Sequence, residues 1–189
     1  MIPIYITGSG VVSAIGVGKD ETLASLKAEK TGIGKMKYLA SCHEELPVGE
    51  VPLSNQEMAQ RLGLADDIRL TRTALMGGLA LGEALKEARL ERDDLKTIPF
   101  ISATTVGGMD RRETYYAHEA ECDLVHAEIA THHCGTSAEM MTKPYGEFAS
   151  LATVSTACSS ATNALITGAN MLRCGMADIV VVGDRKSVV

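Results

Sequence analysis

Residues 151–183 read "LATVSTACSSATNALITGANMLRCGMADIVVVG", and their pattern indicates the fold class. The apolar run Leu151–Ser155 is typical of a strand, and the spacing of small and apolar residues after Cys158 predicts a helix that stops at Gly175. The β-branched run Ile179–Val182 predicts a central strand that is covered on both faces. Because strands and a helix alternate, we expect an α/β protein with a largely parallel sheet and helices on both faces.

The N-terminal third continues this alternation of strands and helices. Ile2–Thr7 is a short apolar run before a glycine turn, which predicts a buried strand. Asp20 is a candidate N-cap for a helix over Glu21–Glu29. Ser54 and Glu57 have the spacing of a capping box, so a second short helix is expected after them.

The longest predicted helix is Asp67–Ala88. Three glycines, Gly77, Gly78 and Gly82, are costly inside a helix, so we expect another backbone to approach closely there. A strand over Thr97–Ala103 follows and ends in a glycine turn. Residues 110–142 are predicted to be helical with a break at Gly135. The helix after Cys158 is predicted to carry Ala161, Leu165, Gly168 and Leu172 on one face.

Composition excludes several classes of protein. The chain has 189 residues and a net charge of −6, which suits one domain and argues against general nucleic-acid binding. No apolar run reaches the length of a membrane span, and the N-terminus lacks the features of a signal peptide. Five cysteines without a C-x-x-C pair argue against a disulfide framework or a structural zinc site. We therefore expect a cytoplasmic protein without a membrane or nucleic-acid partner.

Two further motifs have ordinary interpretations. The loop "GSGVVSAIG" (8–16) fails the dinucleotide-binding pattern because Ser13 stands where the last glycine should be, so it predicts a tight turn. The stretch "HAEIATHHC" holds His126, His132, His133 and Cys134, but their spacing matches no standard zinc motif. Histidines near a helix end are the expected interpretation, and no metal is predicted.

Cys158 is the strongest candidate for chemistry. A sharp strand-to-helix turn exposes a side chain above the sheet, as in the nucleophile elbow of the α/β-hydrolases. Free amides and the dipole at the helix N-terminus stabilise a thiolate, and the same amides can receive an oxyanion when the thiolate attacks a thioester. The pattern favours a nucleophile. It leaves open the alternative that Cys158 is a buried structural cysteine.

Three stretches resemble the β-ketoacyl-acyl-carrier-protein synthases, the elongating condensing enzymes of fatty-acid and polyketide synthesis. They are 5–33, which begins "YITGSGVVSAIG", the segment "ISATTVGGMD" (101–110) and "VSTACSSATNALITGANMLRCGMADIVVVG" (154–183). The resemblance implies the N-terminal half of a thiolase-like fold, from a chain about twice as long that forms a homodimer. It places a family domain over residues 1–183 and leaves 184–189 as an atypical tail.

The resemblance also implies a reaction. Cys158 would take an acyl group from an acyl carrier protein by thioester exchange, and malonyl carrier protein would lose carbon dioxide to give the carbanion that attacks it. The Cys158 N–H would be one oxyanion donor, and no metal or organic cofactor is required. Val106 and Gly107 would border the acyl pocket. Arg69 and Arg72, with help from Arg61, would dock the acidic carrier.

The match is incomplete after Cys158. The catalytic histidines and lysine of the family lie beyond the cysteine, whereas all five histidines here precede Cys158. We therefore expect a half-synthase that is inactive alone and exposes apolar surface, with poor solubility or pairing with another chain. The alternatives are a non-catalytic partner of the chain-length-factor kind, which the retained Cys158 argues against, and a thiolase-like acyltransferase.

Overall fold

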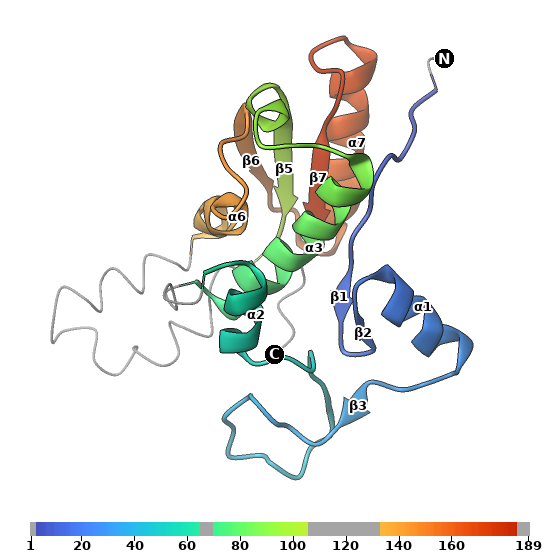
Figure 1. Cartoon of the computed structure of the whole chain (residues 1–189), viewed down its shortest axis with the longest axis vertical. Helices are drawn as coiled ribbons and strands as arrows, with labels where there is room; N and C mark the ends of the chain where they lie inside the picture. The colour runs from blue at the N-terminus through green and yellow to red at the C-terminus, as the bar shows by residue number, and fades with distance from the viewer. Residues whose placement is uncertain (1–2, 65–69, 106–132, 185–189) are drawn as a thin grey trace, which may run out of the picture.

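The computed structural model describes residues 3–64, 70–105 and 133–184, which include a parallel sheet (Figure 1). The sheet has three strands in the order β6-β5-β7, which are β5 (Pro99–Ala103), β6 (Ser150–Val154) and β7 (Val181–Asp184). Helices connect these strands, so the expected α/β class with a parallel sheet is confirmed.

The central strand is β5, not the run near Val182. All five residues of β5 are buried, and Phe100 pairs with Leu151 on one side and with Val181 on the other. The prediction of a covered central strand over Ile179–Val182 was wrong, because β7 lies at an edge of the described sheet and is only partly buried. A β-branched run indicates that a strand needs cover, but it does not indicate where the cover comes from.

Helices cover both faces of the sheet, as predicted. On one face, Phe100 joins a core with residues of α3 (Arg72–Ala88) and α6 (Cys134–Thr142), and its ring lies 5.4 Å from that of Phe148. On the other face, Ile101 and Ala103 pack with Ala164 of α7 (Ser160–Arg173). Phe100 and Ile101, which are adjacent in β5, thus belong to two separate cores, because successive side chains of a strand point to opposite faces.

Helix α7 (Ser160–Arg173) packs tightly on the sheet through small residues. Ala164 is fully buried, and a Cβ added to Gly168 would lie only 3.0 Å from Val182. Of the residues predicted to share one face, Gly168 is buried, whereas Leu165 is 60% exposed. The helix ends as predicted at Gly175, where a φ of +66° and two backbone bonds form a Schellman motif.

The glycines of α3 do permit close approach, but the neighbours are side chains. A Cβ on Gly77 would collide with Met141, and a Cβ on Gly82 would collide with the Tyr145 hydroxyl. Burial raises the pKa of Tyr145, whose hydroxyl donates to the Gly78 carbonyl at 2.8 Å. The helix begins later than predicted, with Thr71 as N-cap, and residues 65–69 lie outside the described part of the chain.

The capping box is confirmed at α2 (Asn55–Arg61). The Glu57 N–H donates to Ser54 Oγ at 3.1 Å, and the Ser54 N–H donates to the Glu57 carboxylate at 2.7 Å. The Ser54 amide holds the pKa of Glu57 below its ordinary value, because the bond favours the charged carboxylate.

Two predicted helix details were wrong. Gly18, not Asp20, is the N-cap of α1 (Lys19–Lys27), and the Thr22 hydroxyl donates to the Gly18 carbonyl at 2.8 Å. Gly135 does not break a helix but lies in the first turn of α6, where its N–H donates to His133.

Short elements complete the described residues. They are β1 (Val12–Ser13) with β2 (Gly16–Val17), β3 (Ile33–Gly34) with β4 (Val48–Gly49), and the 3₁₀ turns η1 (Asp94–Thr97) and η4 (Ala157–Ser159). The first pair confirms the tight turn predicted within 8–16.

The predicted buried strand Ile2–Thr7 was wrong within the residues that the structure describes. Residues 3–7 belong to no strand there, and Tyr5 and Ile6 are 77% and 89% exposed. None of the described helices is both long and apolar enough to cross a membrane.

Candidate active site

Cys158 lies in η4, the turn between β6 and α7, and its side chain is exposed. The preceding residue, Ala157, has a φ of +52°, a left-handed conformation that costs a residue with a Cβ about 1 kcal/mol. The interpretation as a buried structural cysteine is therefore excluded for this chain. A strained turn that exposes its cysteine is the geometry expected of a nucleophile elbow.

Hydroxyl groups hold the strained turn in place. Ser160 Oγ accepts from the Thr156 N–H at 2.9 Å and donates to the Ala157 carbonyl at 2.8 Å. Ser159 Oγ donates to the Thr156 carbonyl at 2.7 Å, and the Asn163 amide donates to Thr156 Oγ1 at 2.8 Å. The serines and threonines around Cys158 are thus more than small neighbours, because they fix the backbone on both sides of it. In the sequence, the spacing of four residues between Ser159 and Asn163 was the signal that these side chains could contact each other on a helix.

The N-terminal end of α7 faces the cysteine turn. The helix has 14 residues and starts at Ser160, and its N-cap Ser159 makes no side-chain cap bond. The first amides of a helix lack intrahelical partners and favour nearby negative charge. Cys158 lies two residues before the first residue of this helix.

The described residues include no acid–base partner bonded to Cys158. His133 Nδ1 accepts from the Gly135 N–H at 3.1 Å at the start of α6, and His43 lies 3.4 Å from Glu45. No cluster of three or more His, Cys, Asp or Glu side chains suited to a metal ion occurs among residues 3–64, 70–105 and 133–184. His126 and His132 lie outside these ranges.

Arg72 connects the start of α3 to the chain before α2. Its guanidinium donates to the carbonyls of Leu53 and Val51 and to Asn55 Oδ1, each at 2.9 Å. It also lies 5.5 Å from the centre of the Tyr38 ring. These bonds give Arg72 a structural role that the sequence did not reveal. The other predicted site residues, Arg69, Val106 and Gly107, lie outside the described residues.

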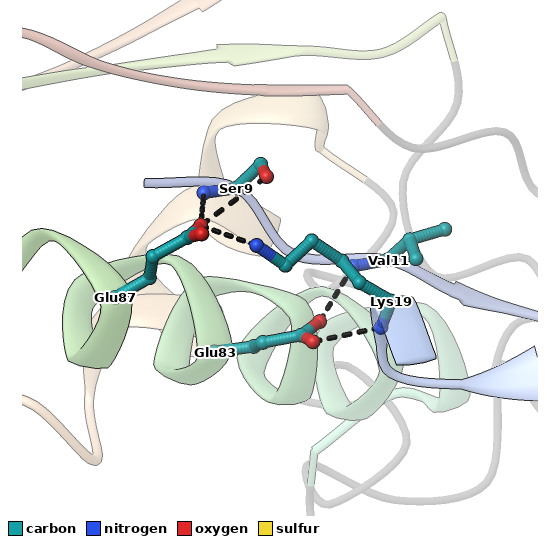
Figure 2. Close-up of polar contacts among 5 residues, drawn as sticks. All are labelled: Ser9, Val11, Lys19, Glu83 and Glu87. Carbon is teal, nitrogen blue, oxygen red and sulfur yellow. Dashed lines mark hydrogen bonds and ion pairs between the residues drawn. The ribbon is translucent and has the colours of Figure 1, made fainter. Parts of the chain in front are cut away.

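Two carboxylates of α3 hold the N-terminal loop, as Figure 2 shows. Glu83 accepts from the Val11 N–H at 3.0 Å and from the Lys19 N–H at 2.7 Å. Glu87 accepts from the Ser9 N–H at 2.7 Å and lies 2.5 Å from Lys19 Nζ. We call these five residues the N-terminal latch. The i,i+4 spacing of the two glutamates was visible in the sequence, but their targets were not.

The N-terminal loop lies directly against the backbone of α3. A Cβ added to Gly8 would collide with the Ala84 carbonyl, and one added to Gly10 would collide with the Ala80 carbonyl. The Lys19 side chain, followed by the Ser9 amide, holds the pKa of Glu87 below its ordinary value. Glycine at both positions is therefore required for the loop to reach the carboxylates.

Solved structures resemble this fold. The ishigamide ketosynthase/chain length factor matches with a TM-score of 0.82 at 24% identity, over 97% of this chain and 47% of that one. AntDE:AntF, a type II PKS acyl-carrier protein in complex with its ketosynthase bound to the hexaketide, matches with a TM-score of 0.66 at 20% identity, over 96% and 45%. These likenesses show a ketosynthase-type, thiolase-like fold.

Sequence comparison agrees. The 3-oxoacyl-[acyl-carrier-protein] synthase 1 of Haemophilus influenzae is 27% identical over 196 aligned residues, which cover 97% of this chain and 46% of that protein. The chain thus spans about half the length of this relative. The family model "Beta-ketoacyl synthase, N-terminal domain" matches residues 1–186. The chain belongs to the β-ketoacyl synthase family, whose N-terminal domain it contains.

Proposed function

We propose that this chain contributes the acyl-accepting half of a 3-oxoacyl-[acyl-carrier-protein] synthase, with Cys158 as the nucleophile. The observation that carries the proposal is the exposed thiol of Cys158 in a strained turn at the N-terminal end of α7. The synthase name of the Haemophilus influenzae relative supports the reaction class.

The proposed chemistry has two steps. The Cys158 thiolate attacks the thioester carbonyl of an acyl carrier, the new carbon–sulfur bond forms, and the carrier thiolate leaves with a proton from solvent. Amides at the start of α7 stabilise the oxyanion. Malonyl carrier then loses carbon dioxide, and its carbanion attacks the acyl group and releases the Cys158 thiolate. No metal or organic cofactor is required for either step.

Condensation requires groups beyond those described near Cys158. The two described histidines, His43 and His133, contact other groups, and no histidine follows Cys158 in the sequence. We therefore propose that the chain alone is acylated on Cys158 but does not make a 3-ketoacyl product.

Mass spectrometry tests this proposal. The purified chain is incubated with an acyl carrier thioester, or with an epoxide electrophile of the cerulenin type, and digested. We expect one adduct on Cys158, absent in Cys158→Ala. Cys42 and Cys174, which are also exposed, are internal controls. Equal modification of all three cysteines, or 3-ketoacyl product from the monomeric chain, would contradict the proposal.

The carrier protein is the proposed macromolecular partner. Carrier proteins of this family are acidic, so a basic patch with Arg69 and Arg72 is the proposed docking site. Because Arg72 also binds the carbonyls of Val51 and Leu53, its substitution should disturb the loop as well. Charge reversal at Arg69 should weaken carrier binding in an assembled enzyme without lowering its stability. Val106 and Gly107 remain the proposed border of the acyl pocket.

A companion of the chain-length-factor kind is the second candidate function. The fold that this chain shares with the ishigamide ketosynthase/chain length factor, at a TM-score of 0.82, is compatible with either kind of subunit. Retention of Cys158 favours the catalytic subunit, so labelling of Cys158 discriminates between them. We propose a homodimer as the assembled form and the cytoplasm as the location.

A further inference from the structure

We propose that Asn163, in the first turn of α7, is a positioning residue for Cys158 and acts through Thr156. The inference rests on the proposed role of Cys158 as the acyl acceptor. It deepens that role, because it names the side chain that connects the cysteine turn to the body of the helix and so fixes the thiol for attack.

Thr156 is the centre of the hydrogen bonds around the cysteine turn. Its N–H donates to Ser160 Oγ at 2.9 Å. Its carbonyl accepts from the Ser159 N–H at 3.2 Å and from the Ser159 hydroxyl at 2.7 Å. Its own hydroxyl oxygen accepts from Asn163 Nδ2 at 2.8 Å. Each of these polar groups of Thr156 is therefore bound by a residue that follows Cys158, so the cysteine backbone is enclosed between bonded neighbours.

Asn163 differs from the two serines in where it is attached. Ser159 belongs to η4 and Ser160 is the first residue of α7, so their bonds move with the turn itself. Asn163 is half-buried, and the next residue, Ala164, is 0% exposed against the sheet. The backbone of Asn163 is thus fixed by packing. Its side chain therefore connects Thr156 to a part of the molecule that does not move with the turn.

Asn163 also determines the direction of the Ser159 hydroxyl. The carboxamide nitrogen has two N–H donors, and it lies 2.8 Å from Thr156 Oγ1 and 3.3 Å from Ser159 Oγ. A serine at an N-cap ordinarily accepts from an amide in the first turn of its helix. Ser159 makes no such bond, and its hydroxyl is directed back to Thr156. Without the Asn163 amide, Ser159 is free to cap α7, which offsets the lost bonds in stability but not in the geometry of the turn.

The turn needs such a connection because it is strained. Ala157 has a φ of +52°, and a residue with a Cβ keeps this conformation only where its surroundings hold it. When the bond from Asn163 is lost, Thr156 and the turn can relax and the Cys158 thiol can take several positions. Acyl transfer from a large thioester requires one attack geometry, whereas a small alkylating reagent reacts with an exposed thiol from many directions.

Two rates at Cys158 test the inference. Mass spectrometry follows acylation of the 189-residue chain by an acyl carrier thioester and, separately, alkylation by iodoacetamide. We expect Asn163→Ala to slow acylation by about 10-fold. Alkylation should stay within about 2-fold of the parent rate, and the denaturant midpoint should not change. The matched control is Asn170→Ala, an exposed asparagine further along α7, which should change neither rate.

A double-mutant cycle tests whether Asn163 acts through Thr156. Thr156→Val removes the hydroxyl that accepts from Asn163. If the two residues act as one unit, the double variant is acylated no more slowly than the slower single variant. Thr156→Ser keeps the acceptor oxygen, so it should be acylated at nearly the parent rate, and Asn163→Ala should still slow it. Independent, multiplicative effects of Thr156→Val and Asn163→Ala would contradict a role through Thr156.

The outcomes separate this inference from the proposed function. If the parent chain and Asn163→Ala are acylated at equal rates, the inference is wrong and the proposed function stands. If Asn163→Ala slows acylation and alkylation equally and lowers the denaturant midpoint, Asn163 has only a structural role and the inference is again wrong. If the parent chain is alkylated but never acylated on Cys158, the proposed function is wrong and the inference fails with it.

Discussion

The Cys158 turn and the N-terminal latch both hold a loop in place, but by different means. The turn uses neutral hydroxyl and amide groups that are close in sequence, such as Thr156 with Ser160, four residues apart. The latch uses carboxylates far along the chain, and Ser9 and Glu87 are 78 positions apart in the sequence. The turn can therefore form as its own segment folds, whereas the latch forms only after α3 is in place.

The difference has consequences for function. The turn that carries Cys158 is closed by bonds within its own segment. A latch made of charged groups responds to pH and salt, and it controls a segment that is still exposed. The two regions therefore differ in how strongly their geometry depends on solution conditions.

The largest expected effect comes from a substitution that forces the N-terminal loop away from α3. In Gly10→Ala the new Cβ collides with the Ala80 carbonyl, so the loop must move away from α3. Forcing a side chain into such a contact should lower the free energy of unfolding by about 3 kcal/mol. Denaturant unfolding measures it. Gly34→Ala, where no atom lies within 4 Å, is the control and should change little. Equal effects at both positions would contradict the close packing of the loop.

The next effect concerns the Cys158 turn. Ser160→Ala removes the acceptor of the Thr156 N–H and the donor to the Ala157 carbonyl. The free energy of unfolding should fall by about 1.5 kcal/mol, and Cys158 should be acylated more slowly because its backbone is less well fixed. Thr167→Ala, which removes one hydroxyl bond to the Asn163 carbonyl further along α7, should leave the acylation rate unchanged. Equal acylation rates in Ser160→Ala and the parent chain would show that the network does not position the thiol.

A smaller effect of opposite sign tests the strain. Ala157→Gly should raise the free energy of unfolding by about 1 kcal/mol, because glycine adopts a φ of +52° without a Cβ clash. Ala161→Gly, in the first turns of α7, should lower it by about 1 kcal/mol. If both variants are destabilised alike, the turn is not strained in solution.

The smallest expected effect is a difference in pH dependence between the N-terminal latch and the Cys158 turn. The pKa of Glu87 is lowered by Lys19 and Ser9, so its contribution is present above the ordinary carboxyl pKa of about 4.3 and is lost as the pH falls through the lower value of the folded state. Hydrogen exchange of the Ser9 amide should therefore accelerate below that range, after correction for the intrinsic rate. The Thr156 amide, whose acceptor is a hydroxyl, should show no such acceleration. If the exchange of the Ser9 and Thr156 amides accelerates equally as the pH falls, the proposed difference between the latch and the turn is wrong.

Several features that depend on neighbours in the sequence were predicted correctly, although the N-cap of α1 and the break at Gly135 were not. The capping box at Ser54, the glycine stop at Gly175 and the strand–turn–helix order around Cys158 each involve groups within a few residues of one another. The residue types at those positions specify their own hydrogen bonds, so the pattern is sufficient to predict them.

Features that depend on distant partners were visible only in the tertiary structure. The covered strand is β5 rather than β7, and the buried side of α7 runs through Ala164 rather than Leu165, because burial depends on which elements pack together. The bonds of Arg72 and Glu87 also join segments that are distant in sequence. Residue type shows that an apolar or charged group needs a partner, but only the folded chain shows which partner it finds and, for residues 3–7, that none of the described residues is that partner.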